Sequence, residues 1–116
     1  MRVLNPRHLF GAARYSLRGL ANAFRHEQSF RHEVLVLAAL ALVLLITRPG
    51  ARVSLVVIGA WIGVMIVELL NSALECALDL ITTERNPVVG RAKDMASAAI
   101  FLGVALNILL WASFLF

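Results

Sequence analysis

The chain has 116 residues, of which 60% are hydrophobic and 16% are charged, with 11 lysines and arginines against 7 aspartates and glutamates. Soluble domains are typically about 45–50% apolar and about 25% charged, so this composition indicates a membrane protein and excludes a soluble α/β enzyme, a disulfide-stapled scaffold and a disordered tail. The formal net charge of +4 favours cytosolic loops beside anionic lipid head groups over nucleic acid, because no soluble basic face with interleaved aromatic residues is present.

An amphipathic helix is predicted at about residues 7–30, beginning after Pro6. Four arginines fall within a stripe about 40° wide on the helical period, and five apolar side chains share a separate arc. The stripe is Arg7, Arg14, Arg18 and Arg25, and the arc is Phe10, Ala13, Leu17, Leu20 and Phe24. Such a helix lies in the membrane interface. A soluble helix packed on a partner is the alternative.

Three membrane spans are expected at about residues 31–47, 53–80 and 93–116. A span needs about 17–25 residues, so the first helix must begin several residues before its apolar run at 34–47. The last run is the clearest, because residues 95–116 contain no charge. All 116 residues are assigned to one domain.

The connections between the spans carry the signals for turns and for orientation. The first is the Arg48-Pro49-Gly50 turn, and the second is predicted as a loop over residues 82–90. Six arginines precede the apolar run at 34–47 and three basic residues lie at positions 82–94, nine in all, against two at positions 48–52. This asymmetry predicts a cytosolic N-terminus and a C-terminus on the far side. Within the second span, Gly59 and Gly63 have a spacing that permits close helix contact.

The second span carries a polar stripe that packing alone does not require. It consists of Glu68, Asn71, Glu75 and Asp79, which share one face within about 80° on the helical period. A carboxylate in mid-bilayer costs roughly 2.5–3.5 kcal/mol on insertion scales, which favours a functional role. The alternative is interhelical hydrogen bonding in an oligomer through Asn71 and Ser72.

The depth of these side chains suggests their chemistry. Glu68 lies about 22 Å along a helix that enters at residue 53, just beneath the cytosolic interface of a hydrocarbon core about 30 Å thick. A carboxylate there can accept a proton from a lipid alcohol. Further out, Glu75 and Glu27 are candidates to hold Mg²⁺, which typically uses one or two carboxylates together with phosphate oxygens.

The third span opens with a charged pair, Lys93-Asp94, that suits phosphate binding at a membrane-surface helix start. Positive-inside anchoring is the alternative. The chain has neither a Walker A motif nor a G-x-G-x-x-G motif, so a nucleotide site would be of another kind. Asn107 is expected to form an interhelical hydrogen bond, and Trp61 and Trp111 to face lipid or to lie in the aromatic belt of the membrane interface.

Several segments together resemble the bacterial integral-membrane diacylglycerol kinases, and the resemblance covers nearly the whole chain. They are Glu-Leu-Leu-Asn-Ser-Ala-Leu-Glu at 68–75, Gly-Arg-Ala-Lys-Asp-Met-Ala-Ser-Ala-Ala at 90–99, Ala-Ala-Arg-Tyr-Ser-Leu-Arg-Gly-Leu at 12–20, Glu27, and Phe-Arg-His-Glu at 30–33. The resemblance implies an all-α homotrimer in the bacterial inner membrane, with three spans and a surface helix per chain and active sites shared between neighbours. It also implies Mg-ATP-dependent phosphorylation of diacylglycerol to phosphatidic acid.

The resemblance carries roles to matching positions in this sequence. It implies that Glu68 accepts the proton with support from Asn71, and that Glu27 and Glu75 hold the metal ion. It implies a nucleotide site that also includes Glu27 and Glu75, with His8, Tyr15, Glu84, Arg85, Asn86, Lys93 and Asp94, and a lipid site of Phe30, Arg31, Glu68, Ser97 and Trp111.

Some positions depart from that pattern and keep alternatives open. His8 stands where the family typically has an arginine, and residues 83–87 are more similar to the undecaprenol kinase branch of the family. A small proton-coupled transporter also relies on a membrane-embedded glutamate but usually has four spans. A non-catalytic assembly subunit would use the polar stripe and the glycines for packing alone.

Overall fold

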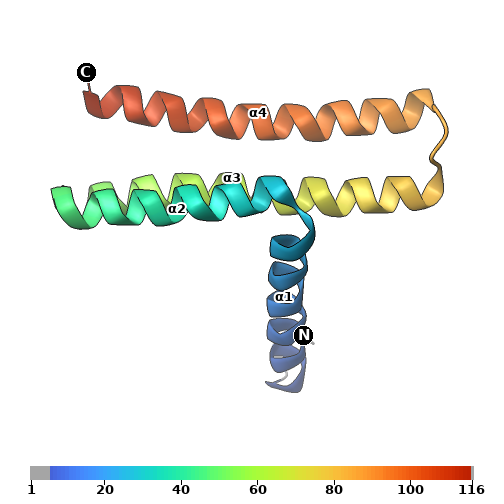
Figure 1. Ribbon diagram of the computed structural model, residues 1–116, viewed down its shortest axis with the longest axis horizontal. Coiled ribbons are helices and arrows are strands. Elements are labelled where there is room, and N and C mark those ends of the chain that lie inside the picture. Colours follow the sequence, from blue (N-terminus) through green and yellow to red (C-terminus); the bar gives the residue numbers. More distant parts are fainter. Residues whose placement is uncertain (1–5, 116) are drawn as a thin grey trace.

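The computed structural model describes residues 6–115, and every regular element in that range is a helix. The helices are α1 (Pro6–His26), α2 (Gln28–Thr47), α3 (Ala51–Ile81) and α4 (Pro87–Leu115). Figure 1 shows α2, α3 and α4 running alongside one another, with α1 crosswise to them. The last three helices are long and apolar enough to cross a membrane. The expected all-α fold is confirmed, although the expected end at Phe116 lies outside the described residues.

The first helix ends earlier than its sequence pattern predicts. It stops at His26, Glu27 takes an extended conformation, and residues 28–30 belong to α2. The end of α1 leaves backbone carbonyls without helical partners. The guanidinium of Arg31 donates to two of them, Phe24 O at 3.0 Å and Arg25 O at 2.9 Å. This cap stabilises an abrupt change of direction and gives the first span 20 residues, enough to cross the hydrocarbon core.

The α2–α3 connection is a tight turn built on left-handed backbone. Arg48 closes α2 with φ of 49°, and its N–H donates to Leu44 O at 2.9 Å. Gly50 has φ of 106°, a conformation that side chains rarely adopt and that glycine reaches without steric cost. The Arg-Pro-Gly turn predicted from the sequence therefore has a backbone reason.

The α3–α4 connection is shorter than the predicted loop over residues 82–90, because α4 begins at Pro87. Asn86 Oδ1 accepts the backbone N–H of Val88 at 2.9 Å and of Val89 at 3.3 Å, as an N-cap does. Proline is favoured at the first helical position, where no N–H is needed. The Asn-Pro pair thus starts the helix instead of extending the loop.

Helix α3 is the centre of the bundle and packs on both α2 and α4. Val57 and Val64 are buried on α3. A Cβ added at Gly103 of α4 would meet Val64 Cγ2 at 3.4 Å, so the two helices approach closely there. A Cβ added at Gly59 or Gly63 would meet nothing within 4 Å. The close contact expected of these two glycines is not formed within one chain.

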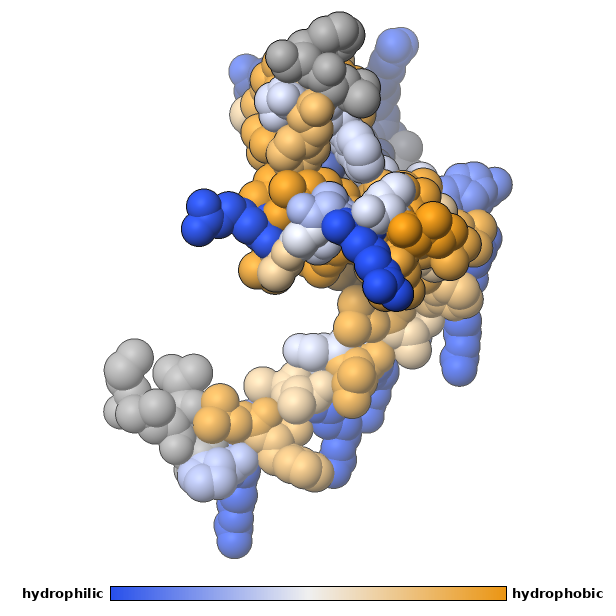
Figure 2. Space-filling model, turned by 90° about the vertical axis from the view of Figure 1, so that its left-hand side faces the viewer, coloured by the Kyte–Doolittle hydropathy of each residue, from blue (hydrophilic) through white to orange (hydrophobic). Residues whose placement is uncertain are grey.

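The spanning helices leave most of their apolar surface uncovered. Only 6%, 17% and 6% of the most apolar stretches of α2, α3 and α4 are buried. Seen from the bundle end that carries the α2–α3 connection, the surface is largely apolar, and long hydrophilic side chains project from the bundle and from α1 (Figure 2). Exposed apolar faces of this extent need lipid or other protein chains around them.

Candidate active site

The acidic stripe on α3 passes from a buried environment to an exposed one. Glu68 is only 7% exposed and Ser72 is also buried, whereas Glu75 and Asp79 are exposed. Figure 1 shows the C-terminal part of α3 and the N-terminal part of α4 extending as a hairpin beyond the point where α1 joins the bundle. The stripe therefore connects the interior of the bundle with the hairpin.

Four carboxylates from three parts of the chain form what we call the carboxylate cluster: Glu27, Glu33, Glu68 and Glu75. Glu27 lies at the α1–α2 junction and Glu33 lies one turn further along α2. Like-charge repulsion acts on Glu68 from Glu27 and Glu75, and on Glu33 from Glu68. The fold thus places Glu27 and Glu75 within electrostatic range of Glu68.

Glu33 is the member of the cluster that sequence reasoning missed as a site residue. Its Oε1 is buried and accepts no hydrogen bond within the described part of the chain. The available signal was a carboxylate within the expected first span and directly before its apolar run, where an ionisable side chain is expensive and usually functional. Its backbone carbonyl is occupied, because Trp61 Nε1 donates to Glu33 O at 2.9 Å.

The carboxylate cluster has no cationic partner of its own. Among the residues that the structure describes, the ion pair that forms joins Lys93 to Asp79 and involves none of the four glutamates. Like charges held close together in an apolar setting must be relieved by a proton or a bound cation. The cluster is therefore suited to proton transfer, to cation binding, or to both.

A cavity of about 560 Å³ lies between α1 and α3, with Glu27 among its lining residues. Its walls are mostly apolar, and they consist of Ser16, Gly19, Leu20, Asn22, Ala23, His26, Leu69, Ser72, Ala73 and Cys76. A cavity with apolar walls and one carboxylate at its edge suits an amphiphilic ligand.

Asn71 faces α4. It lines a smaller hollow of about 180 Å³ between α3 and α4 with Val67, Leu70, Leu74, Ala96 and Ala99. No hydrogen bond joins Asn71 to Glu68 in residues 6–115. The two side chains share a face of the helix but have different neighbours.

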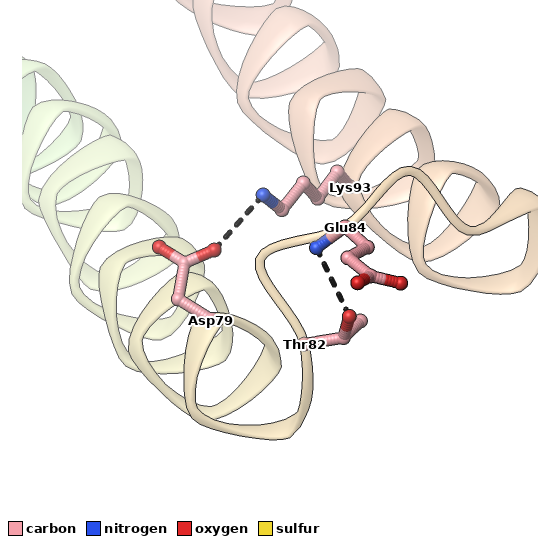
Figure 3. A network of polar contacts seen from close by, with 4 residues as sticks. All are labelled: Asp79, Thr82, Glu84 and Lys93. Atoms are coloured by element: carbon pink, nitrogen blue, oxygen red, sulfur yellow. Dashed lines mark hydrogen bonds and ion pairs between the residues drawn. The ribbon is translucent and has the colours of Figure 1, made fainter.

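The charged residues of the hairpin face each other across its two helices. Figure 3 shows Lys93 of α4 reaching toward α3, where Lys93 Nζ lies 3.1 Å from Asp79 Oδ1. In the same view, the Glu84 N–H donates to Thr82 Oγ1 at 3.0 Å and shapes the loop. Asp94 is exposed and lines a different hollow, beside Val88, Arg91, Ala92 and Met95. Lys93 and Asp94 are neighbours in sequence, but their side chains have different neighbours in the fold.

Two residues predicted for the nucleotide lie together on α1. His8 and Tyr15 are both exposed and line a hollow of about 230 Å³. The guanidinium of Arg18 lies 5.6 Å from the centre of the Tyr15 ring. Because α1 runs away from the bundle (Figure 1), its N-terminal part stands apart from the hairpin of the same chain.

The residues predicted for the lipid are spread along the bundle. Phe30 is buried at the start of α2, Arg31 caps α1, and Ser97 is exposed on α4. Trp111 lies near the end of α4 in an edge-on contact with Phe114 at 6.4 Å between ring centroids. The contact of Asn107 with Ala60 sets the level of α4 against α3, which places Trp111 about 18 Å from Glu68 along the bundle.

The described residues of one chain supply only some of the ligands that a metal ion needs. No three His, Cys, Asp or Glu side chains in residues 6–115 lie close enough together to hold one. Mg²⁺ commonly takes one or two carboxylates and completes its shell with water and phosphate oxygens. Glu27 and Glu75, which both act on Glu68, fit that requirement in the presence of a phosphate ligand.

Comparison with known proteins gives a consistent result. Residues 14–115 match the family described as prokaryotic diacylglycerol kinase. The chain is 39% identical over 110 residues to a diacylglycerol kinase from Haemophilus influenzae, which covers 94% of this chain and 92% of that protein. It is 39% identical over 112 residues to one from Pseudomonas aeruginosa (94% and 89%) and 36% identical over 100 residues to one from Escherichia coli K12 (86% and 82%).

Proposed function

Because the chain belongs to the prokaryotic diacylglycerol kinase family, we propose that it transfers the γ-phosphoryl group of ATP to the free hydroxyl of diacylglycerol within the membrane. The products are phosphatidic acid and ADP. The observation that carries this proposal is Glu68, a buried carboxylate on a spanning helix that forms no hydrogen bond or ion pair with the described residues. An isolated acid at that position is costly unless it acts on a ligand.

Glu68 is the proton acceptor in this mechanism. The lipid hydroxyl oxygen attacks the γ-phosphorus, the bond from that phosphorus to the β,γ-bridging oxygen breaks, and the hydroxyl proton passes to Glu68. Asn71, one turn away, supports the orientation of the reacting groups. Since little covalent chemistry falls to the protein in such a transfer, positioning and charge provide most of the rate increase.

The hairpin supplies the nucleotide site. Lys93 is assigned to the phosphates, and its ion pair with Asp79 has side chains 42% and 60% exposed. Pairs of that kind contribute about 0–1 kcal/mol, so a phosphate oxygen can replace Asp79 as the partner of the ammonium group at little cost. The remaining nucleotide contacts are assigned to His8, Tyr15, Glu27, Glu75, Glu84, Arg85, Asn86 and Asp94.

Glu27 and Glu75 are assigned to Mg²⁺. When bound, the ion supplies positive charge that offsets the phosphate oxygens of ATP. In this assignment, the two carboxylates hold the metal and so keep the phosphates on the aqueous side of Glu68.

The lipid enters from the bilayer with its hydroxyl directed to Glu68. Phe30, Arg31 and Ser97 are assigned to the head-group end of the diacylglycerol. Trp111, about 18 Å further along the bundle, is then at the depth of an acyl chain. The charge asymmetry of the connections supports a cytosolic N-terminus in the bacterial inner membrane, with the hairpin on the side where ATP is found.

We assign the enzyme to a homotrimer with active sites shared between neighbours. Two observations support this. The spanning helices are largely uncovered in one chain, and the α1 residues assigned to the nucleotide stand apart from the hairpin of their own chain. A neighbouring copy would both cover apolar surface and bring a second α1 to the site.

The decisive experiment is ATP consumption by the purified protein in mixed micelles, with diacylglycerol, undecaprenol or no added lipid at fixed Mg²⁺. Turnover with diacylglycerol supports the proposal. Turnover with undecaprenol alone keeps the reaction but changes the lipid. An absence of turnover with either lipid, from a protein that is folded and monodisperse, refutes kinase activity.

Two other classes of function make different predictions. A four-span proton-coupled transporter would return the C-terminus to the side of the N-terminus, whereas three spans place it opposite, and a reporter fused after Phe116 distinguishes them. Within residues 6–115 the structure has three candidate spans. A non-catalytic assembly subunit would bind other chains without consuming ATP.

A further inference from the structure

Two side-chain hydrogen bonds tie all three spanning helices together at one level of the bundle. Trp61 Nε1 on α3 donates to Glu33 O on α2 at 2.9 Å. Asn107 Nδ2 on α4 donates to Ala60 O on α3 at 3.1 Å and also to Gly103 O at 2.9 Å. The contact points on α3 are consecutive residues, so α3 is fixed to one neighbour on each side at the same height.

The bond from Trp61 ends on the residue that bears the buried, unpartnered carboxylate. Side chains on a helix tilt toward its N-terminus, and α2 runs antiparallel to α3, so the Glu33 side chain tilts in the direction in which α3 leads from Trp61 to Glu68. Like-charge repulsion acts between Glu33 and Glu68 across this interface. The position of Glu33 along and around the α2 axis therefore sets its distance to Glu68.

Apolar contacts alone do not hold α2 firmly at one position along and around its axis against α3. Spanning helices in lipid gain no hydrophobic driving force from packing on each other, so directional hydrogen bonds contribute disproportionately to their register. An indole N–H inside a bundle also needs an acceptor. In this chain it finds one on α2, instead of facing lipid as the sequence suggested for Trp61.

We propose that Trp61 is a positioning residue for phosphoryl transfer, which holds α2 against α3 so that the Glu33 and Glu68 carboxylates keep their relative placement. This inference rests on the proposed lipid kinase activity. Trp61 touches no reacting group; it acts through Glu33.

The test is Trp61→Phe, which removes the N–H donor and keeps an aromatic ring. We expect kcat with diacylglycerol to fall about 3–10-fold, the range that corresponds to one hydrogen bond, while the KM for ATP changes less than twofold. Asn107→Leu is the matched control, because it removes a bond to α3 at the same level without touching α2. Its effect on kcat should be the same in the wild-type and Glu33→Gln backgrounds, because the bond between α3 and α4 does not act through Glu33.

A double-mutant cycle separates positioning from a general loss of stability. We expect Glu33→Gln to lower kcat by itself, and Trp61→Phe to have less than a twofold further effect in the Glu33→Gln background, because the two residues act as one unit. Equal factors for Trp61→Phe in both backgrounds would overturn the proposal. So would an unchanged kcat in either single variant, or a loss in Asn107→Leu that disappears in the Glu33→Gln background.

Two further measurements keep the proposal testable if Trp61→Phe does not fold. Trp61→Leu, which also lacks a donor, takes its place in the same cycle with the same expected outcomes. In the wild-type protein, the indole N–H of Trp61 should exchange with D₂O more slowly than that of N-acetyltryptophanamide in the same micelles, and equal exchange would contradict the hydrogen bond. Failure of the proposed function is recognised separately, since the wild type itself would then show no lipid-dependent turnover.

Discussion

The side chains of one helical face of α3 occupy opposite environments. Glu68 is buried and forms no hydrogen bond or ion pair within the described residues, whereas Asp79 is exposed and paired with Lys93. A buried carboxylate without a hydrogen bond or a counter-ion is destabilising in the free protein. Its presence is understandable when a ligand brings it a proton, and the first prediction tests this at Glu68.

Glu68→Gln removes the proton acceptor and keeps the side-chain volume. We expect kcat with diacylglycerol to fall about 10²–10⁴-fold, the usual contribution of a positioned general base. The fold should survive, because an amide is cheaper to bury than a carboxylate. Steady-state kinetics and size-exclusion chromatography in detergent check both points. Activity near the wild-type level in Glu68→Gln would remove Glu68 from the role of base.

Glu75 is exposed and, like Glu27, acts electrostatically on Glu68, so its assigned role depends on the metal ion. Glu75→Gln should shift the Mg²⁺ concentration for half-maximal activity upward at least about tenfold, because one of the two protein carboxylates available to the ion is lost. A Mg²⁺ titration at saturating ATP measures this. Cys76→Ser, a neighbouring change that removes no carboxylate, should leave the titration unchanged; a wild-type titration in Glu75→Gln would rule out the assignment.

At the scale of the elements, α3 is longer than a bilayer requires. Its 31 residues extend about 46 Å, whereas the hydrocarbon core is about 30 Å thick. The excess forms one arm of the hairpin that extends beyond the α1 junction (Figure 1), and Lys93 pairs with Asp79 across this hairpin. The length of the helix therefore brings a chain of polar residues from the membrane interior to water.

The hairpin depends on where α4 begins. Asn86→Ala removes the side-chain oxygen that caps α4, and we expect a loss of about 1 kcal/mol in the free energy of unfolding. Asn86→Asp keeps the cap and should retain the stability. Reversible unfolding in mixed micelles measures both variants. If Asn86 acts mainly as a cap, the KM for ATP should change only in destabilised Asn86→Ala. A raised KM for ATP in stable Asn86→Asp would instead indicate that Asn86 contacts the nucleotide.

At the scale of the whole molecule, one chain has too little core to account for its fold by itself. Phe30, Val57 and Val64 are its buried apolar residues, against spanning helices that are almost entirely uncovered. The carboxylate cluster also lies at the junction between α1 and the bundle, where a neighbouring chain can reach it. Assembly is thus expected to contribute to both stability and catalysis.

Subunit mixing tests the shared site. Glu68→Gln and Lys93→Ala should each be inactive when pure, because the one lacks the base and the other the phosphate contact. If an active site takes Glu68 from one chain and Lys93 from a neighbour, dissociating and reassembling the two inactive proteins together should restore a measurable fraction of wild-type activity. Reassembly of each variant alone is the control. Persistent inactivity of the mixture, with mixed trimers demonstrated, would place both residues in the site within one chain.

Much of the fold follows from local properties of the sequence. Apolar runs and the arginine stripe predict three spans and a surface helix because burial in lipid depends on composition and helical period alone. The sequence predicts the ends of the helices less accurately. The termination of α1 at His26 depends on Arg31 reaching back to its carbonyls, and the start of α4 at Pro87 depends on a cap at Asn86 that also reads as a loop signal.

The candidate site likewise has a part that the sequence predicts and a part that it does not. The helical period puts Glu68 and Glu75 on one face, and the cost of charge in a membrane marks them as functional, so the sequence by itself determined this part. Only the tertiary structure decided that Glu33 joins Glu68, that Trp61 bonds to α2, and that Lys93 pairs with Asp79 instead of Asp94. These contacts depend on the register and rotation of one helix against another. That is a property of packing between segments, which no periodicity within a segment encodes.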